Sequence, residues 1–345
     1  MSTLIIPCAG LSTRFPTNKP KYLLTHPDGR LMLEKAYEGF NFSYDRLIIP
    51  ILEQHCKKFD AYDIVSEAFP TSEILILKEQ TSCQAETIYQ TIIKKSVDGY
   101  FISKDCDNLI SVDLPAEPTN LVVGVDLRNR LDISSVASKS FIIVNEQNIV
   151  IDILEKEVCS NYISAGVYGF KNSQDFMDGY EAIYDTAGEI YPSHVISFLL
   201  SQGDTFNIYY STRFDDYGDM ISWRGEREKH TTYFIDVDGV IFKNSGKYGN
   251  HTWYDYSIPL TKNIEVIKTL SRCGAQIIIT TARPKSQDGL LAHELKKNKI
   301  PYDYIVSGCN HSKRVIINDF AESNPYPSCE AINIPRDSDN LVEFL

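Results

Sequence analysis

The sequence predicts two α/β domains in one chain, residues 1–228 and residues 229–345. Over the first two hundred residues, short apolar runs rich in β-branched residues alternate with helical patterns, which is typical of α/β domains. The stretch 223–232, "WRGEREKHTT", is polar and has no periodic apolar face, so we expect a linker there. Beyond it the alternation starts again, and 345 residues are enough for two separate cores.

The first domain is expected to contain a mainly parallel sheet, because its apolar runs lack strict alternation and are each followed by a loop and a helix. Two helical crossovers, a hairpin over 140–156 that turns at Asn145 to Asn148, and five buried strands are predicted. The strands are 4–7, 47–52, 73–77, 99–103 and 121–127, and the helices are 31–40 and 86–95.

The second domain repeats the pattern on a smaller scale. Strands are predicted at 233–237, 275–281, 302–308 and 314–319, and helices at 262–273 and 289–298.

Composition excludes some classes of partner. A net charge of −12 disfavours nucleic acids and anionic membranes, and no apolar run approaches the roughly 20 residues of a membrane helix. The N-terminus lacks the pattern of a signal peptide, and the eight cysteines are scattered with no C-x-x-C pair, so reduced thiols in a cytoplasmic protein are expected. The sequence does not indicate the oligomeric state.

The first candidate site follows the first strand, in "IIPCAGLSTRFPTNKPKYLL" (5–24). A turn of small residues after a strand exposes backbone N–H groups that can hold phosphate oxygens. Arg14 could bind a triphosphate in bidentate fashion, and Lys21 adds a point charge. From these residues alone, a surface turn with two solvated cations is an equal alternative.

This stretch resembles the triphosphate loop of the sugar-phosphate nucleotidyltransferases. Ala9, Gly10, Arg14, Pro20 and Lys21 match the family pattern, while Ser12 replaces its second glycine. Further matches follow in the family's order over about residues 3 to 223. The resemblance implies a mixed, Rossmann-type sheet of the GT-A kind.

The resemblance also implies roles for residues further along the chain. In "KDCDN" (104–108), Asp105, Asp107 or both would ligate Mg²⁺, and Asp216 in "FDDYGD" would be a further ligand. Residues expected beside the nucleotide base are Gln84 and Glu86, and those expected on the acceptor side are Glu155, Lys156 and Gly166.

The implied reaction is transfer of a nucleotidyl group from an NTP to a phosphorylated sugar, polyol or aminoalcohol, with release of pyrophosphate. In its short length the first domain resembles the compact cytidylyl- and uridylyltransferases, and this resemblance favours CTP as the nucleotide. The family suggests the supply of activated units for surface polysaccharide as the pathway.

A second candidate site begins at "YFIDVDGVIF" (233–242), where Asp236 and Asp238 end a strand just before a glycine. One carboxylate can attack a phosphoryl group and the other can serve as acid and base. Two carboxylates facing an anionic substrate repel it, so a divalent cation is expected.

With "IIITTARP" and "SKRVIINDF", this segment resembles the four motifs of the haloacid dehalogenase (HAD) phosphatases. The resemblance implies Asp236 as nucleophile, Asp238 as acid and base, and Thr281, or alternatively Thr280, on the phosphoryl oxygen. Lys313 would offset the phosphate charge, and Asp319 would complete a Mg²⁺ shell with Asp236 and Asp238, supported by Asn318 or Glu322. Intervals of about 43 residues from Asp238 to Thr281 and about 32 from Thr281 to Lys313 leave no room for a full cap domain, so a capless enzyme is predicted, with residues 248–256 as a small flap at most.

Three functional hypotheses remain. The first is a bifunctional enzyme that combines nucleotidyl transfer with phosphomonoester hydrolysis. The second makes one domain catalytic and the other regulatory, and the third is a nucleotide-binding sensor without turnover.

Overall fold

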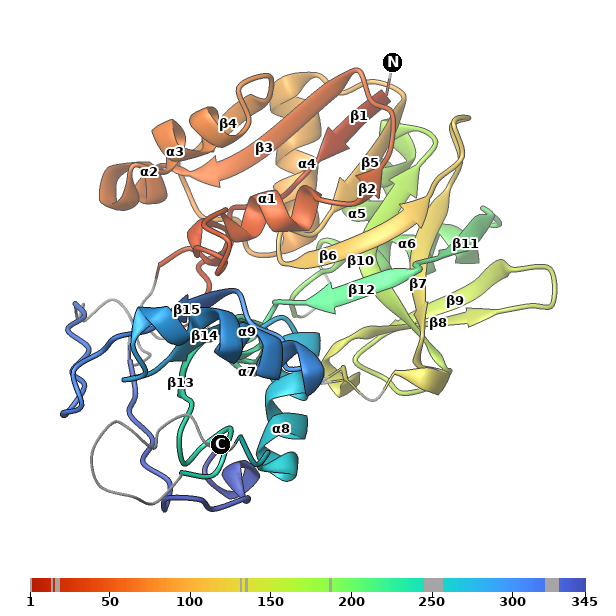
Figure 1. The fold of residues 1–345 in the computed structure, drawn as a ribbon. Helices are drawn as coiled ribbons and strands as arrows, with labels where there is room; N and C mark the ends of the chain where they lie inside the picture. The colour runs from red at the N-terminus through yellow and green to blue at the C-terminus, as the bar shows by residue number, and fades with distance from the viewer. Residues whose placement is uncertain are drawn as a thin grey trace. The chain divides into compact units, whose positions relative to one another are not determined.

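The computed structural model describes residues 2–13, 15, 19–130, 132–133, 136–185, 188–244, 257–319 and 329–345. The chain divides into two compact units (Figure 1), the first ending at Trp223 and the second beginning at Arg224. Each unit is described by itself below.

The first unit is built on a nine-stranded sheet. Its strand order is β4-β3-β1-β5-β10-β7-β11-β9-β8, with an additional pairing between β10 and β8. The strands are β1 (Ser2–Ile5), β3 (Arg46–Leu52), β4 (Glu73–Leu77), β5 (Tyr100–Lys104), β7 (Leu121–Asp126), β8 (Ser140–Val144), β9 (Ile149–Glu155), β10 (Tyr162–Phe170) and β11 (Phe206–Tyr210).

The sheet is mixed rather than mainly parallel. β4, β3, β1 and β5 are parallel to one another, whereas β10 is antiparallel to both β5 and β7. The five predicted strands all form, within two residues of their expected ends. The prediction of a mainly parallel sheet was wrong for the other half of the sheet, which consists of β10, β7, β11, β9 and β8. The apolar runs reveal burial on both faces but not the direction of the partner strand.

Burial on both faces explains those continuous apolar runs. Leu4 packs into one apolar core and Ile5 into another, because successive side chains of a strand point to opposite faces. The first core also contains side chains from the helices α1 (Met32–Tyr37) and α3 (Ala61–Ala68), and α2 (Glu53–Phe59) packs beside them. The second core contains side chains of α4 (Gln84–Lys95), α5 (Ser173–Ile183) and α6 (Pro192–Ser201).

Two smaller features complete the first unit. A three-stranded sheet has the order β12-β6-β2 and consists of β2 (Phe40–Asn41), β6 (Asn108–Asp113) and β12 (Arg213–Asp216). The hairpin of β8 and β9 forms as predicted, and its turn closes with Asn148 in the left-handed region at φ 59°.

The expected linker at 223–232 is wrong for most of its length, since α7 (Met220–Lys229) spans the boundary between the units. This helix has little apolar periodicity. Arg224 and Glu228 form an i,i+4 ion pair on its surface, and Glu226 pairs with Lys229. Such charge pairs support a helix without an apolar stripe, so the polar composition was misleading.

The second unit is a parallel three-stranded sheet, β13 (Thr232–Asp236), β14 (Gln276–Thr280) and β15 (Tyr304–Val306), with the helices α8 (Thr261–Arg272) and α9 (Asp288–Lys297). Both helices begin and end within one residue of the prediction. Its core includes Val237, Ile264, Ile277, Ile279 and Leu295.

The predicted strand at 314–319 does not form. These residues have no regular secondary structure, and the side chain of Ile317 is 93% exposed. An apolar run forms a buried strand only where a neighbouring strand and a covering layer are available, and the described residues of this unit provide neither to this segment.

None of the described helices could span a bilayer, and the longest of them, α4 and α8, have 12 residues each.

Candidate functional site

The loop after β1 in the first unit carries the residues predicted to hold a triphosphate. Ala9 is buried, and a β-carbon at Gly10 would meet no atom of the described residues within 4 Å. Gly10 has no positive φ, so neither its backbone conformation nor its packing within the chain requires a glycine. Close approach of a ligand is a remaining reason for a glycine here. Arg14 lies outside the described residues.

Ser12 stands where the nucleotidyltransferase pattern that this loop resembles has its second glycine. Its φ of 55° is in the left-handed region, which costs a non-glycine residue about 1 kcal/mol. Its Oγ accepts a hydrogen bond of 2.8 Å from the backbone N–H of Lys21. The serine therefore ties the loop to the residue that bears the predicted phosphate-binding ammonium.

Lys21 and the acidic turn are brought together, although they are far apart in sequence. The Nζ of Lys21 donates to Oδ2 of Asp107 at 2.5 Å. Asp107 lies in the turn between β5 and β6, and β5 is the parallel neighbour of β1 in the sheet. The carboxyl ends of neighbouring parallel strands meet at one sheet edge, which is where ligands bind in open α/β sheets.

Asp105 is fixed by Gly166 and Gln84. Its backbone N–H donates to the carbonyl oxygen of Gly166 at 2.8 Å, and its Oδ1 accepts from Nε2 of Gln84 at 2.5 Å. Gly166 has a φ of 71° and lies at an irregularity in β10, and a β-carbon there would collide with the carboxylate of Asp105. Gly166 was predicted on the acceptor side, but its contacts are with the acidic turn.

Asp107 and Asp216 both lie close to Gly218. A β-carbon at Gly218 would be 2.8 Å from Oδ2 of Asp107 and 3.1 Å from Oδ1 of Asp216. The backbone also joins the two segments, since the N–H of Tyr217 donates to the carbonyl oxygen of Asp107 at 2.8 Å. Lys139 forms an ion pair with Oδ2 of Asp216.

The electrostatics follow from burial and like charge. Burial, and then the neighbouring charge of Asp107, raise the pKa of Asp105 to about 6, while the hydrogen bond from Gln84 opposes the shift. Burial lowers the pKa of Lys104 to about 8. The acidic turn thus combines two close carboxylates with a buried ammonium.

The carboxylates suit a hard cation. Within the described residues, oxygens of Asp105, Asp107 and Asp216 do not all gather within 4.8 Å, so the three do not form a closed cage. Mg²⁺ commonly uses one or two carboxylates and completes its shell with water and phosphate oxygens. The pair Asp107 and Asp216 fits that chemistry.

The other predicted residues of this site are engaged as follows. Glu86 accepts hydrogen bonds at the start of α4 from the N–H and Oγ of Ser82, so its carboxylate serves the helix terminus. Glu155 accepts from the hydroxyls of Ser140 and Ser193. Lys156 has a φ of 58°, and its Nζ lies 2.9 Å from the hydroxyl of Tyr191 and 4.6 Å from the ring centroid.

Three residues of the first site escaped sequence reasoning: Lys104, Lys139 and Gly218. Lys104 begins the motif "KDCDN", in which the resemblance assigns roles only to the two aspartates. Gly218 lies in the "FDDYGD" turn, so its place beside Asp216 in the sequence could have pointed to it. Nothing near Lys139 in sequence points to Asp216, which is 77 residues away.

In the second unit, Asp236 and Asp238 line a pocket of about 250 Å³ at the carboxyl end of β13. The chain turns directly after them as predicted, with Gly239 at φ 96° and its N–H donating to the carbonyl of Phe242 at 2.6 Å. Burial raises the pKa of Asp236, and the nearby Arg314 opposes this shift.

The cations of this pocket are arginines. Arg283 is buried and donates two hydrogen bonds to Asp238, of 2.6 and 3.0 Å. Arg314 donates to Asp236 at 3.1 Å, and Arg336 and His311 also line the pocket. Sequence reasoning selected Lys313 instead of its neighbour Arg314, and it overlooked Arg336 altogether.

Four predicted residues of the second site are not among those lining the pocket: Thr280, Thr281, Lys313 and Asp319. Thr281 is fully buried, and its Oγ1 accepts from the N–H of Arg283 at 3.1 Å. Thr280 lies 3.5 Å from the carbonyl of Ile235. Lys313 and Asp319 are exposed because the expected strand does not form, whereas Glu322 and the proposed flap at 248–256 fall outside the described residues.

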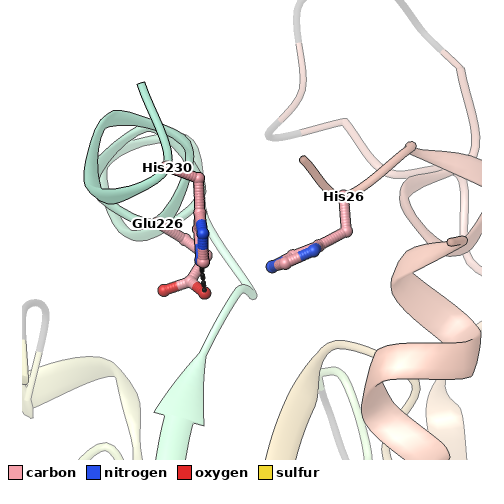
Figure 2. Close-up of side chains that lie close together, drawn as sticks. All are labelled: His26, Glu226 and His230. Atoms are coloured by element: carbon pink, nitrogen blue, oxygen red, sulfur yellow. Dashed lines mark hydrogen bonds and ion pairs between the residues drawn. The ribbon is translucent and has the colours of Figure 1, made fainter. Parts of the chain in front are cut away.

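The start of the second unit carries one further polar pair. Figure 2 shows the side chains of Glu226 and His230 side by side at the end of α7, with Nε2 of His230 3.4 Å from Oε1 of Glu226. This i,i+4 contact stabilises the end of the helix.

Comparison with known proteins gives a result for the fold. No protein-family model and no curated protein matches the chain. Among solved structures, it is similar to a nucleoside-diphosphate-sugar pyrophosphorylase from Vibrio cholerae, with 19% identity, a TM-score of 0.55, and coverage of 65% of this chain and 98% of that one.

Two further structures agree. An inositol-1-phosphate CTP transferase from T. maritima has 14% identity and a TM-score of 0.52, covering 64% of this chain and 91% of its own. A putative glucose-1-phosphate thymidylyltransferase from Bacillus anthracis has 16% identity and a TM-score of 0.52, covering 66% and 94%. At these identities the likeness concerns the fold. The 65% of this chain that the first structure covers equals the share of the chain that residues 1–223 make up. The first unit therefore has the fold of the sugar-phosphate nucleotidyltransferases.

Proposed function

We propose that the first unit transfers a nucleotidyl group from an NTP to a phosphorylated sugar, polyol or aminoalcohol and releases pyrophosphate. One observation carries the proposal. Lys21, from the loop after β1, pairs with Asp107 beside Asp216, at the ligand-binding edge of a nucleotidyltransferase fold.

CTP is the favoured nucleotide. The first unit is compact, and one of the similar structures is named a CTP transferase that acts on inositol 1-phosphate, a phosphorylated polyol. The two others are named for a nucleoside-diphosphate sugar and for thymidylyl transfer. We infer a cytoplasmic reaction that supplies activated units for surface polysaccharide, because NTPs and phosphorylated sugars are cytoplasmic metabolites.

Mg²⁺ would be held by Asp107 and Asp216, with Asp105 in the same turn as a further candidate ligand, and would supply neutralisation of charge on the phosphate oxygens. The ammonium of Lys21 adds a fixed positive charge for the departing pyrophosphate, and Lys139 adds another beside Asp216. The side chains thus orient two anionic substrates and reduce their mutual repulsion.

In the reaction, an oxygen of the acceptor phosphate forms a bond to the α-phosphorus of the NTP while the bond to the pyrophosphate oxygen breaks. The attacking oxygen is already ionised at neutral pH, so no side chain has to remove a proton from it. The chain's contribution is alignment and charge compensation.

³¹P NMR tests the transfer. The protein with Mg²⁺, each NTP in turn and a panel of sugar, polyol and aminoalcohol phosphates should give pyrophosphate and a new diphosphate diester. Lys21→Ala should abolish both signals, whereas the matched control Lys19→Ala should retain them. Binding of an NTP by calorimetry without any product after hours would instead support the nucleotide sensor.

We also propose that the second unit hydrolyses a phosphomonoester in the manner of a capless HAD phosphatase. The supporting observation is the pocket in which Asp236 and Asp238 lie among Arg283, Arg314 and Arg336. A carboxylate oxygen of Asp236 would attack phosphorus and expel the alcohol, and water would then release orthophosphate from the aspartyl-phosphate. Mg²⁺ would be held by the carboxylate of Asp236. After the substrate displaces the pairing of Asp238 with Arg283, Asp238 would take up a proton from solvent, donate it to the leaving alcohol and then accept a proton from the attacking water.

Crossed substitutions separate the two activities. Asp236→Asn should stop orthophosphate release and leave pyrophosphate release unchanged, and Lys21→Ala should do the reverse. If only one activity is ever observed, the second hypothesis, one catalytic and one regulatory domain, replaces the bifunctional enzyme. If either substitution stops both activities in a folded protein, the two sites are not independent.

A further inference from the structure

Lys104, the last residue of β5, is fully buried and directly precedes the acidic turn at residues 105–107. Its Nζ donates three hydrogen bonds, to the carbonyl oxygen of Asp105 at 3.0 Å, the carbonyl oxygen of Asn108 at 2.9 Å and Oδ1 of Asn108 at 2.8 Å. All three N–H groups of the ammonium are therefore used within five residues of sequence.

Packing alone does not require a lysine at this position. Burying an ammonium costs several kcal/mol unless hydrogen bonds and opposite charges compensate. A methionine of similar length would fill the space without that cost. The ammonium is therefore best explained by its three acceptors.

Those acceptors lie at the two ends of the turn. Asp105 directly follows β5, and Asn108 is the first residue of β6, so the ammonium joins the points where the turn begins and ends. Asp105 and Asp107 project from the backbone between these points. Any change in the separation of the two ends changes the separation of the two carboxylates.

The outer side of the turn is fixed by other groups. Gly166 and Gln84 hold Asp105, while Lys21 and Tyr217 hold Asp107. Lys104 contacts the backbone at both ends of the turn.

We propose that Lys104 is a positioning residue, which sets the spacing of Asp105 and Asp107 for a divalent cation through its three hydrogen bonds to the turn. The proposal rests on the proposed metal site of the first unit. It assigns Lys104 no contact with substrate.

Mn²⁺ binding tests this role without using activity as the readout. The full chain carries Asp236→Asn and Asp238→Asn, so that the second unit's carboxylates do not contribute, and free Mn²⁺ is measured by EPR during titration. In this background Lys104→Met should weaken Mn²⁺ binding about 10- to 100-fold, as is typical for groups that orient metal ligands. The control Lys35→Met removes another buried lysine, which lies in α1 and pairs with Glu38 just after that helix, and should leave binding unchanged.

Each outcome decides a separate question. If the background protein binds no Mn²⁺, the proposed metal site itself fails. If it binds Mn²⁺ and folded Lys104→Met binds equally well, the role of Lys104 is overturned.

A second pair of variants decides the case in which Lys104→Met does not fold, as judged by circular dichroism. Asn108→Ala removes only one of the three acceptors and should weaken binding severalfold. Asn108→Asp keeps an acceptor oxygen and should retain the affinity. Equal affinities in folded Asn108→Ala and the background protein would contradict the proposal.

Discussion

Gly166 and Gly218 each lie where a β-carbon would meet a carboxylate of the candidate metal site. The first accommodates Asp105, and the second accommodates Asp107 and Asp216. A glycine can thus serve a site by leaving room for the side chains that do the chemistry.

Gly166→Ala should therefore damage both stability and nucleotidyl transfer. A positive φ costs alanine about 1 kcal/mol, and the new methyl group must displace the Asp105 carboxylate. We expect a loss of about 1–3 kcal/mol in urea unfolding and a large loss of pyrophosphate release.

Gly10→Ala is the matched control, because its β-carbon meets none of the described residues within 4 Å and its backbone has no positive φ. It should unfold like the wild type. If this loop receives the triphosphate, the KM for the NTP should rise. A stable Gly166→Ala protein with normal transfer would show that Asp105 can move without consequence.

The sequence pointed to Lys21, Asp107 and Asp216 individually, but it did not indicate that Lys21 forms an ion pair with Asp107. The ion pair of Lys139 with Asp216 joins residues whose separation has no local signature. Ser12 illustrates the opposite case, because the family pattern marked it as a departure, and its left-handed φ gives the physical reason why glycine is usual there.

In the first unit, a buried polar contact joins α2 to the short 3₁₀ helix Lys21–Leu23. His55 in α2 lies 3.1 Å from the hydroxyl of Tyr22 and is almost fully buried. Burial, and to a lesser degree the charge of Lys58, lower the pKa of His55 to about 4. In the unfolded chain the same pKa is about 6.5.

The first unit should therefore lose stability in acid. Between about pH 6.5 and 4 the unfolded state binds a proton at His55 that the folded state does not, so the stabilisation is complete above 6.5 and is lost as the pH falls toward 4. Urea unfolding at pH 7.5, 6 and 5 can be followed by the fluorescence of buried Trp223, in a Trp253→Phe background.

His55→Gln removes this titration and should flatten the pH dependence of the unfolding free energy. Comparison of the two proteins cancels the contribution of other acidic groups. Parallel pH profiles would contradict the assignment.

The segment 314–319 of the second unit offers a test of burial. Ile317→Ala should change the unfolding free energy by less than about 0.5 kcal/mol, because its side chain is 93% exposed. Ile279→Ala, in the core strand β14, should cost about 2–5 kcal/mol. A comparable cost at both positions would indicate that 314–319 packs as the strand that its apolar run suggested.

Elements were predictable where local pattern and tertiary environment agree, as in α8, α9 and the hairpin of β8 and β9. They were missed where long-range context decides. The polar helix α7 relies on charge pairs, and the antiparallel course of β10 depends on its neighbours in the sheet.

For the whole molecule, α7 is the feature that crosses from one unit to the other. A chain cut after Trp223 keeps only four residues of this helix, which is too few to be helical by themselves. Trp223 is buried and contacts the rings of His26 and Tyr217.

A fragment of residues 1–230 should thus be more stable than a fragment of residues 1–223, by about 1–3 kcal/mol, the value of a well-buried large side chain. Urea unfolding of both fragments provides the measurement. Equal stabilities would mean that Trp223 keeps its packing without the rest of α7.

The partners of the acidic turn also determine when the site can form during synthesis. The turn at 105–107 is translated early, but its backbone partners are Gly166 and Tyr217. The second of these emerges about 110 residues after Asp107, which at ribosomal rates corresponds to roughly 5–20 s. The nascent chain therefore carries an incomplete acidic turn until nearly all of the first unit has left the ribosome, and cation binding is among the last properties that this unit acquires.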